Sequence, residues 1–318
     1  MGGKGLIDRR DFYALGVAGI LCAVISWACS EAVFSSVITL NQTDPSSEQE
    51  PRPYSELIRQ GNIWFDGDPL IVYSQMTELW SGAHALRGQR HPLFSLFTTP
   101  LVIAIHDLTH VPFSIIIRVL LAIWAAAGGS LFFLICRQIT GRLLEASVWT
   151  LLFASSSGFV FWSGIPESFP FGMVTILLPF AMLAYLSRLR HSEMQFTLAT
   201  FLSLVVTVTN VMSGFICTLL AFRPKQSLGI FKTVVCLVVY GLFLQAFLLP
   251  QTQRVNWLQL NVSKQLRWGN APESGGAFMK ARDVLVCGQL IPDVAQRAVP
   301  ITADNVMAGL TVQAEPFT

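Results

Sequence analysis

The chain has 318 residues, of which 53% are hydrophobic and 13% carry a charge, and its formal net charge is +2. Soluble domains carry about 25% charged residues, so this composition excludes an ordinary soluble enzyme. The small net charge, with no basic tract interleaved with aromatic residues, argues against nucleic-acid binding. Windows such as 143–166 and 233–249 hold at most one charged residue each. In a bilayer such windows must be helical, so we predict an all-α, polytopic integral membrane bundle.

The first apolar run, residues 12–40, follows a short basic segment. It is longer than the apolar part of a signal peptide and no small-residue cleavage site ends it, which predicts an uncleaved first span with a cytoplasmic amino terminus. We expect residues 41–90 to form an external loop, in which residues 69–86 are an amphipathic helix lying on the membrane. The predicted apolar face of that helix consists of Leu70, Tyr73, Met76, Thr77 and Trp80.

Six further apolar windows follow, at residues 92–105, 113–136, 146–164, 169–186, 196–222 and 228–249. The window 92–105 is short for a hydrocarbon core of about 30 Å. The window 196–222 is long and is interrupted by Asn210, Ser213 and Gly214, which predicts two short helices in place of one.

The basic loops at Arg137, Arg188 and Arg223 all lie in the cytoplasm under two conditions. Residues 92–105 must dip into the membrane without crossing, and 196–222 must cross twice. If residues 92–105 do cross, the orientation inverts from Phe113 onward. We therefore expect one membrane domain, residues 1–250, and a short non-cytoplasmic tail, residues 251–318.

Three carboxylates are candidates for chemistry. Asp66 and Asp68 directly precede Pro69, so Asp68 could simply cap the predicted helix, or one of the two could be a catalytic base or metal ligand. Glu167 begins a later apolar window, where it could offset the helix dipole. The three could also share a divalent cation if the fold brings them together, which leaves metal dependence open. No cysteine spacing indicates a disulfide framework or a zinc site.

A basic cluster, Arg87, Arg90 and His91, precedes the window at residue 92. These side chains could extend to the membrane surface as basic residues at helix ends commonly do, or they could hold a lipid phosphate. Glu31, near the end of the first span, is a candidate functional residue, because an acidic side chain within or beside a span costs free energy. Arg118 near the start of its own span is explained by extension to the surface.

The order of these elements resembles the amino-terminal half of the GT-C superfamily of membrane glycosyltransferases, which includes protein O-mannosyltransferases and the lipid A aminoarabinose transferase. The resemblance covers roughly residues 10–250. It implies a catalytic aspartate at Asp68 or Asp66. His91-Pro92-Leu93 would correspond to the family's Lys- or His-Pro-Pro-Leu motif, which lies near the lipid phosphate. Glu167 would correspond to an acid that follows later in the family's sequence. This chain departs from the family in having one proline there, in reading Asp-Gly-Asp for Asp-Glu, and in being shorter than most members.

The resemblance implies a transferase that moves a sugar from a polyprenyl-phosphate donor to an acceptor at the non-cytoplasmic face of a bacterial inner membrane or an ER-type membrane. Asp68 or Asp66 would be the general base, and Arg87, Arg90 and His91 would hold the departing phosphate. Membrane lipids and other membrane proteins are further expected partners. Two alternatives stay open: a non-catalytic, GT-C-derived structural subunit of a larger membrane complex, and a transporter, which the few charges within spans and the lack of an inverted repeat disfavour.

Overall fold

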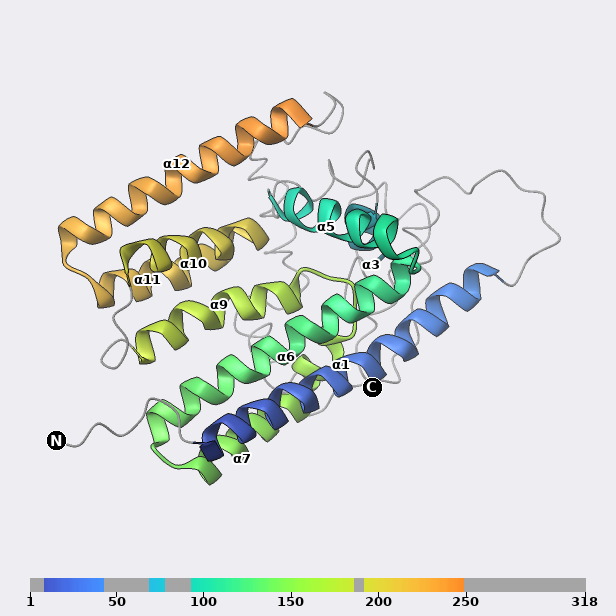
Figure 1. Cartoon of the computed structure of the whole chain (residues 1–318), viewed down its shortest axis with the longest axis horizontal. Coiled ribbons are helices and arrows are strands. Elements are labelled where there is room, and N and C mark those ends of the chain that lie inside the picture. Colours follow the sequence, from blue (N-terminus) through green and yellow to red (C-terminus); the bar gives the residue numbers. More distant parts are fainter. Residues whose placement is uncertain (1–8, 43–68, 78–92, 186–191, 249–318) are drawn as a thin grey trace, which may run out of the picture.

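The computed structural model describes residues 9–42, 69–77, 93–185 and 192–248, and all regular structure in these ranges is helical (Figure 1), as the composition predicts. The α-helices are α1 (Arg9–Gln42), α3 (Pro69–Thr77), α5 (Phe94–Thr109), α6 (Phe113–Thr140), α7 (Leu143–Ser155), α8 (Ser157–Ser163), α9 (Phe169–Ala184), α10 (Glu193–Val206), α11 (Val211–Ala221) and α12 (Pro224–Leu248). A 3₁₀ turn, η1 (Val208–Asn210), joins α10 to α11.

Three described helices are long and apolar enough to cross a membrane: Arg9–Ala32, Phe113–Thr140 and Pro224–Leu244. The bent pair α7–α8 would make a fourth if it counts as one span. Large apolar side chains are exposed along the same helices. They include Val17, Ile20 and Val24 on α1, Val119 and Ile123 on α6, Val148, Leu151 and Leu152 on α7, and Val235, Val239 and Phe243 on α12. Exposed apolar area on this scale suits contact with lipid and would promote aggregation in water.

The antiparallel pair α1 and α6 is the most extensive helix pair of the bundle (Figure 1). The two helices approach closely where small residues face each other: a Cβ atom added to Gly129 would collide with Cys22, and one added to Gly19 would lie 2.9 Å from Ser130 Oγ. Small residues permit this approach in membranes, where packing drives association in place of the hydrophobic effect.

An ion pair joins α1 to α6 at each end of their contact. Arg137 Nε donates to Asp11 Oδ1 at 2.7 Å, and Arg118 donates to Glu31 at the other end. The two pairs are about 30 Å apart along either helix at a rise of 1.5 Å per residue, and neither helix carries a charge between them. This length matches the hydrocarbon thickness of a bilayer, so the ion pairs mark the two levels at which charge becomes tolerable.

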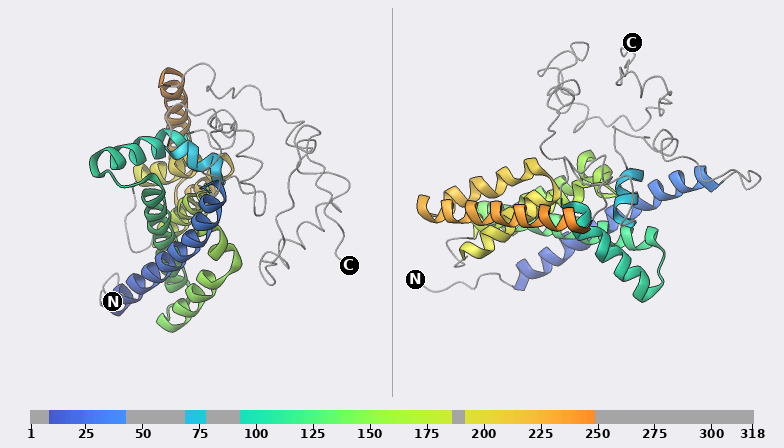
Figure 2. Two further views of the ribbon diagram at one scale, coloured as in Figure 1. Left: turned by 90° about the vertical axis from the view of Figure 1, so that its right-hand side faces the viewer. Right: turned by 90° about the horizontal axis from the view of Figure 1, so that it is seen from above.

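Helices α3 and α5 lie at the end of the bundle that contains the Arg118–Glu31 pair. Helix α5 runs across the end of α6, not alongside it (Figure 2), and two residues, Val111 and Pro112, complete the connection after His110. The 92–105 window therefore forms a helix that is steeply inclined to its neighbour.

Helix α3 begins at Pro69, as predicted from the proline. Its buried side chains are Val72, Gln75 and Met76, which pack against α5 and α6. The predicted apolar face was therefore only partly right: it contained Met76 and the half-buried Tyr73 but missed Val72 and Gln75. Hydropathy alone could not place Gln75 inside, where its backbone oxygen accepts a hydrogen bond from Thr99 Oγ1 at 2.5 Å. Residues 78–86 of the predicted helix lie outside the described residues.

The window 146–164 is not one straight helix, because α7 and α8 meet at Ser156 with a bend of 60°. The Ser156 hydroxyl donates to Phe153 O at 2.7 Å and accepts from Phe159 N at 3.3 Å, which caps the second helix. The bend turns α8 and the segment after it toward α1.

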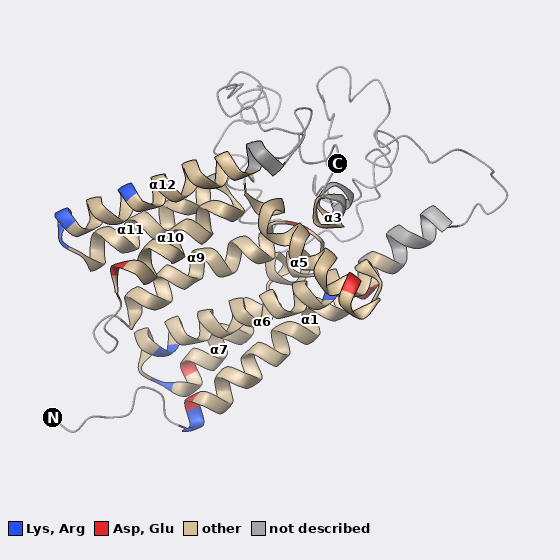
Figure 3. Cartoon of the chain, turned by 45° about the horizontal axis from the view of Figure 1, so that its top comes forward, with Lys and Arg blue, Asp and Glu red and all other residues tan. Residues whose placement is uncertain are grey.

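The window 196–222 folds back on itself as α10 and α11, which agrees with the expectation of two short helices. The helices touch at Gly214, where a Cβ atom would lie 2.7 Å from Thr200 Cα. As a result the start of α10, the end of α11 and the start of α12 lie at the same end as the start of α1 and the α6–α7 loop (Figure 1). Most described Lys and Arg residues gather at that end (Figure 3).

Candidate functional site

Glu167 is the one fully buried acid among the acidic residues that the structure describes. It lies in the segment 164–168 between α8 and α9, all of which is buried although it is not helical. Its Oε2 accepts from Ser168 N at 3.1 Å, and its own N–H donates to Ile165 O at 2.7 Å. Burying a carboxylate is costly, so this turn departs from what packing alone would select.

Helix α1 holds this turn by direct backbone contact. Ser26 Oγ donates to Ser163 O at 2.7 Å. One residue on, Gly164 lies so close to α1 that a Cβ atom would be 2.5 Å from Cys29 Cβ and 2.9 Å from Ser30 N. Only glycine permits such an approach, and the position of Glu167 therefore depends on Gly164.

The Arg118–Glu31 pair is attached to the same stretch of α1. Arg118 Nε donates to Ser30 Oγ at 3.3 Å, and its guanidinium lies 4.2 Å from the centroid of the Trp27 ring. The sequence singled out Glu31 but explained Arg118 as a snorkelling side chain, and so missed their pairing. The available signal was the antiparallel order of two adjacent spans, which places the end of one beside the start of the next.

The helices that follow the predicted motifs meet at this end of the bundle. Phe171, four residues after Glu167, contacts Phe94 and Trp124, each with ring centroids 5.0 Å apart. Val72 and Met76 of α3 belong to the same buried cluster. Helix α3 begins directly after Asp68 and α5 begins shortly after His91, so both motifs are tied in sequence to helices that pack near the Glu167 turn.

Five of the predicted site residues lie outside the described residues: Asp66, Asp68, Arg87, Arg90 and His91. The structure therefore does not place them relative to Glu167. Within the described ranges no group of three or more His, Cys, Asp or Glu side chains could hold a metal ion. A metal site at Glu167 would therefore need ligands from outside the described ranges, where Asp66 and Asp68 lie.

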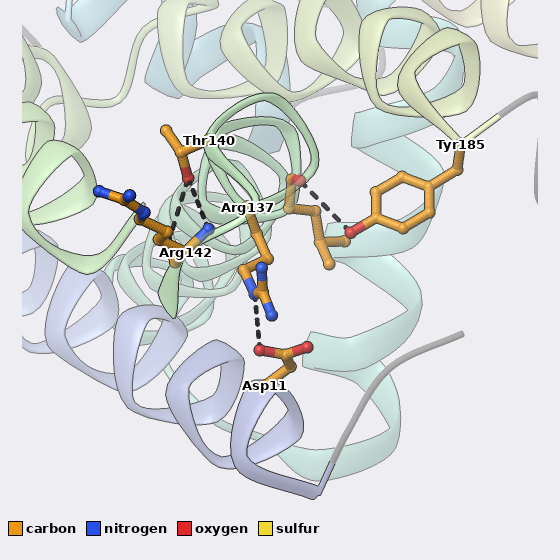
Figure 4. Close-up of polar contacts among 6 residues, drawn as sticks. Asp11, Arg137, Thr140, Arg142 and Tyr185 are labelled. Atoms are coloured by element: carbon orange, nitrogen blue, oxygen red, sulfur yellow. Dashed lines mark hydrogen bonds and ion pairs between the residues drawn. The ribbon is translucent and has the colours of Figure 1, made fainter. Parts of the chain in front are cut away.

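Polar contacts at the opposite end of the bundle are structural (Figure 4). Besides the Asp11–Arg137 pair, Tyr185 OH donates to Leu134 O at 3.4 Å, and Thr140 Oγ1 bonds the backbone of Arg142. Gly141 ends α6 in the left-handed conformation with φ of 68°. The Thr140 and Gly141 contacts close the α6–α7 connection, whereas the Tyr185 bond joins the end of α9 to α6.

A surface pocket lined by Arg223, Pro224, Lys225 and Gln226 lies at the start of α12. It contains none of the predicted site residues. No family model, no curated protein and no solved structure matches this chain.

Proposed function

We propose that this protein is a membrane glycosyltransferase of the GT-C type, which moves a sugar from a polyprenyl-phosphate donor to an acceptor at the non-cytoplasmic face. The supporting observation is the packing of α3, α5 and the start of α9 into one buried cluster. These helices follow the Asp68, His91 and Glu167 motifs, which are spread over about a hundred residues of sequence. An active site at the membrane surface requires three such motifs to lie together, and the packing of the helices that follow them supports that arrangement.

In the proposed reaction an acceptor hydroxyl attacks the anomeric carbon of the sugar while the bond from that carbon to the phosphate oxygen breaks. Asp68 or Asp66 takes the hydroxyl proton, and the polyprenyl phosphate leaves with its charge held by Arg87, Arg90 and His91. A general base contributes about 10² to 10⁴-fold. Stabilisation of the leaving phosphate by preorganised cations supplies a further part of the rate.

Glu167 enters this proposal as a third carboxylate, either beside the aspartates around a divalent cation or as a charge that orients the basic cluster. Its complete burial also favours the alternative, a non-catalytic GT-C-derived subunit, because a carboxylate enclosed by side chains cannot touch a substrate unless the turn opens. The two hypotheses differ in what the purified protein binds and transfers.

The direct test is to purify the full chain in detergent and analyse bound lipid by mass spectrometry, then to supply a polyprenyl-phosphate sugar and an acceptor extract from cells that lack the protein. We expect a polyprenyl-phosphate lipid to co-purify and labelled sugar to appear in the acceptor fraction. Co-purification of a stable protein partner with neither lipid nor transfer would favour the structural subunit.

The proposed orientation places the end with Arg9, Arg137 and Arg223 in the cytoplasm. Asp107 in α5 and Met194 in α10 are exposed at opposite ends of the bundle. In a variant whose native cysteines are replaced, we expect Asp107→Cys to react with a membrane-impermeant maleimide on intact cells. Met194→Cys should react only after permeabilisation. Labelling of both from the same side would contradict the arrangement of helices, and the reverse pattern would invert it.

A further inference from the structure

The Arg118 guanidinium is held by α1 independently of its acidic partner. Its Nε donates to Ser30 Oγ, and that hydroxyl itself donates to Trp27 O at 2.8 Å, which fixes its direction. The guanidinium carbon lies 4.2 Å from the Trp27 ring centroid and 6.0 Å from that of Phe34. Stacking on an aromatic face and a hydrogen bond through Nε leave the outer edge of the guanidinium for an anion.

The acid that now occupies this edge is the exposed member of the pair. The side chain of Arg118 is 11% exposed, whereas that of Glu31 is 61% exposed. A carboxylate so exposed can return to solvent at little cost, because it recovers its hydration. The nearly buried guanidinium needs a counter-charge in place, since an unpaired charge in that position is costly. The geometry therefore favours exchange of Glu31 for another anion over simple opening of the pair.

The position of Arg118 selects a phosphate group carried by a lipid. Arg118 lies in the second turn of α6, and a planar guanidinium binds phosphate oxygens in pairs. It lies about 30 Å from the Asp11–Arg137 pair along α6, so it stands at the opposite boundary of the apolar layer. The headgroup region, which contains the phosphates of membrane lipids, begins at that boundary.

We propose that Arg118 binds the phosphate group of a lipid and that Glu31 is an internal placeholder that occupies the guanidinium when the lipid is absent. This inference rests on the proposed function, for which it adds a phosphate ligand outside the 87–91 cluster. The Glu31 carboxylate and the lipid phosphate compete for Arg118, and neither forms a covalent bond with it.

The test measures binding of farnesyl phosphate to the full chain in nanodiscs of uncharged phosphatidylcholine. Glu31→Gln removes the competing charge and keeps a similar shape. A larger fraction of the protein is then competent to bind, so we expect binding of farnesyl phosphate to be about three- to tenfold tighter. Arg118→Gln should weaken binding at least about tenfold, because a charge-assisted hydrogen bond is lost. In the Arg118→Gln background, Glu31→Gln should have no further effect.

Glu145→Gln is the matched control, because Glu145 pairs with Arg142 at 2.7 Å on the opposite end of the bundle. It should leave affinity unchanged. Affinity that is unchanged or weakened in Glu31→Gln would overturn the proposal, even if Arg118→Gln fails to fold. Inorganic phosphate that binds as tightly as farnesyl phosphate would overturn the lipid assignment.

Failure of this inference is distinguishable from failure of the glycosyltransferase proposal. Farnesyl phosphate binding that depends on Arg90 but not on Arg118 would refute the placeholder and leave the proposed enzyme intact. Farnesyl phosphate binding that depends on Arg118 and Glu31, in a protein that transfers no sugar, would support the placeholder role of Glu31 and refute the glycosyltransferase proposal.

Discussion

Asp68→Asn should abolish sugar transfer while the protein still inserts and purifies normally. A lost general base lowers the rate about 10² to 10⁴-fold. Asparagine caps helices about as well as aspartate, so a helix that begins at Pro69 should form in the variant as in the natural chain. The measurement is transfer of labelled sugar from a polyprenyl-phosphate pool, normalised to the amount of folded protein.

Asp66→Asn is the companion variant, because the sequence places both aspartates before the same helix. We expect the larger loss at Asp68, because it directly precedes Pro69, the first residue of α3, in the sequence. Full activity in both variants would refute the catalytic assignment and make the structural subunit the better hypothesis. Equal loss of activity and of folded protein would refute it as well, since the catalytic hypothesis requires an intact fold.

The sequence predicts those parts of the fold that follow from local chemistry. Pro69 starts α3 because proline suits the first turn of a helix. Likewise, Asn210, Ser213 and Gly214 predict the division of the 196–222 window, and the structure divides it at Val208–Asn210, although Ser213 and Gly214 themselves lie within α11. In both cases a few neighbouring residues determine the outcome, so no knowledge of tertiary packing is needed.

Features that depend on a distant partner could not be predicted. The 60° bend at Ser156 lies in an apolar window that the sequence presents as one helix. The turn that follows the bend contacts α1, which is distant in sequence. Burial of Gln75 likewise depends on the packing of α3 against α5 and α6. The pairing of Arg118 with Glu31 needed the register between α1 and α6. For the candidate site, the sequence identified Glu167 as an acid of interest but not that it would be fully enclosed.

A single stretch of α1 connects the two features of the candidate site. Between Ser26 and Glu31 this helix bonds the end of α8, contacts Gly164 and holds Arg118. A displacement of this stretch would therefore move the Glu167 turn and the Arg118 guanidinium together. Helix α1 is therefore the element that aligns both.

Gly164→Ala should strongly destabilise the protein, because the added Cβ would meet backbone atoms that cannot rotate away. It would lie 2.5 Å from Cys29 Cβ, and 2.9 Å from both Cys29 C and Ser30 N. Overpacking of this kind costs typically about 1 to 3 kcal/mol, and relief here requires separating α1 from the turn. We expect a lower thermal unfolding midpoint in detergent, together with weaker farnesyl phosphate binding as Arg118 loses its support.

Gly16→Ala is the control on the same helix, since nothing lies within 4 Å of a Cβ atom at that position. Alanine favours a helix over glycine by about 1 kcal/mol, so this variant should be as stable as the natural chain or slightly more so. Gly164→Ala with the same unfolding midpoint as Gly16→Ala would show that the turn does not rest on the backbone of α1. The position of Glu167 would then have to be set by α9 alone. A lower midpoint only in Gly164→Ala, with unchanged lipid binding, would confine the contact to stability and separate it from the Arg118 site.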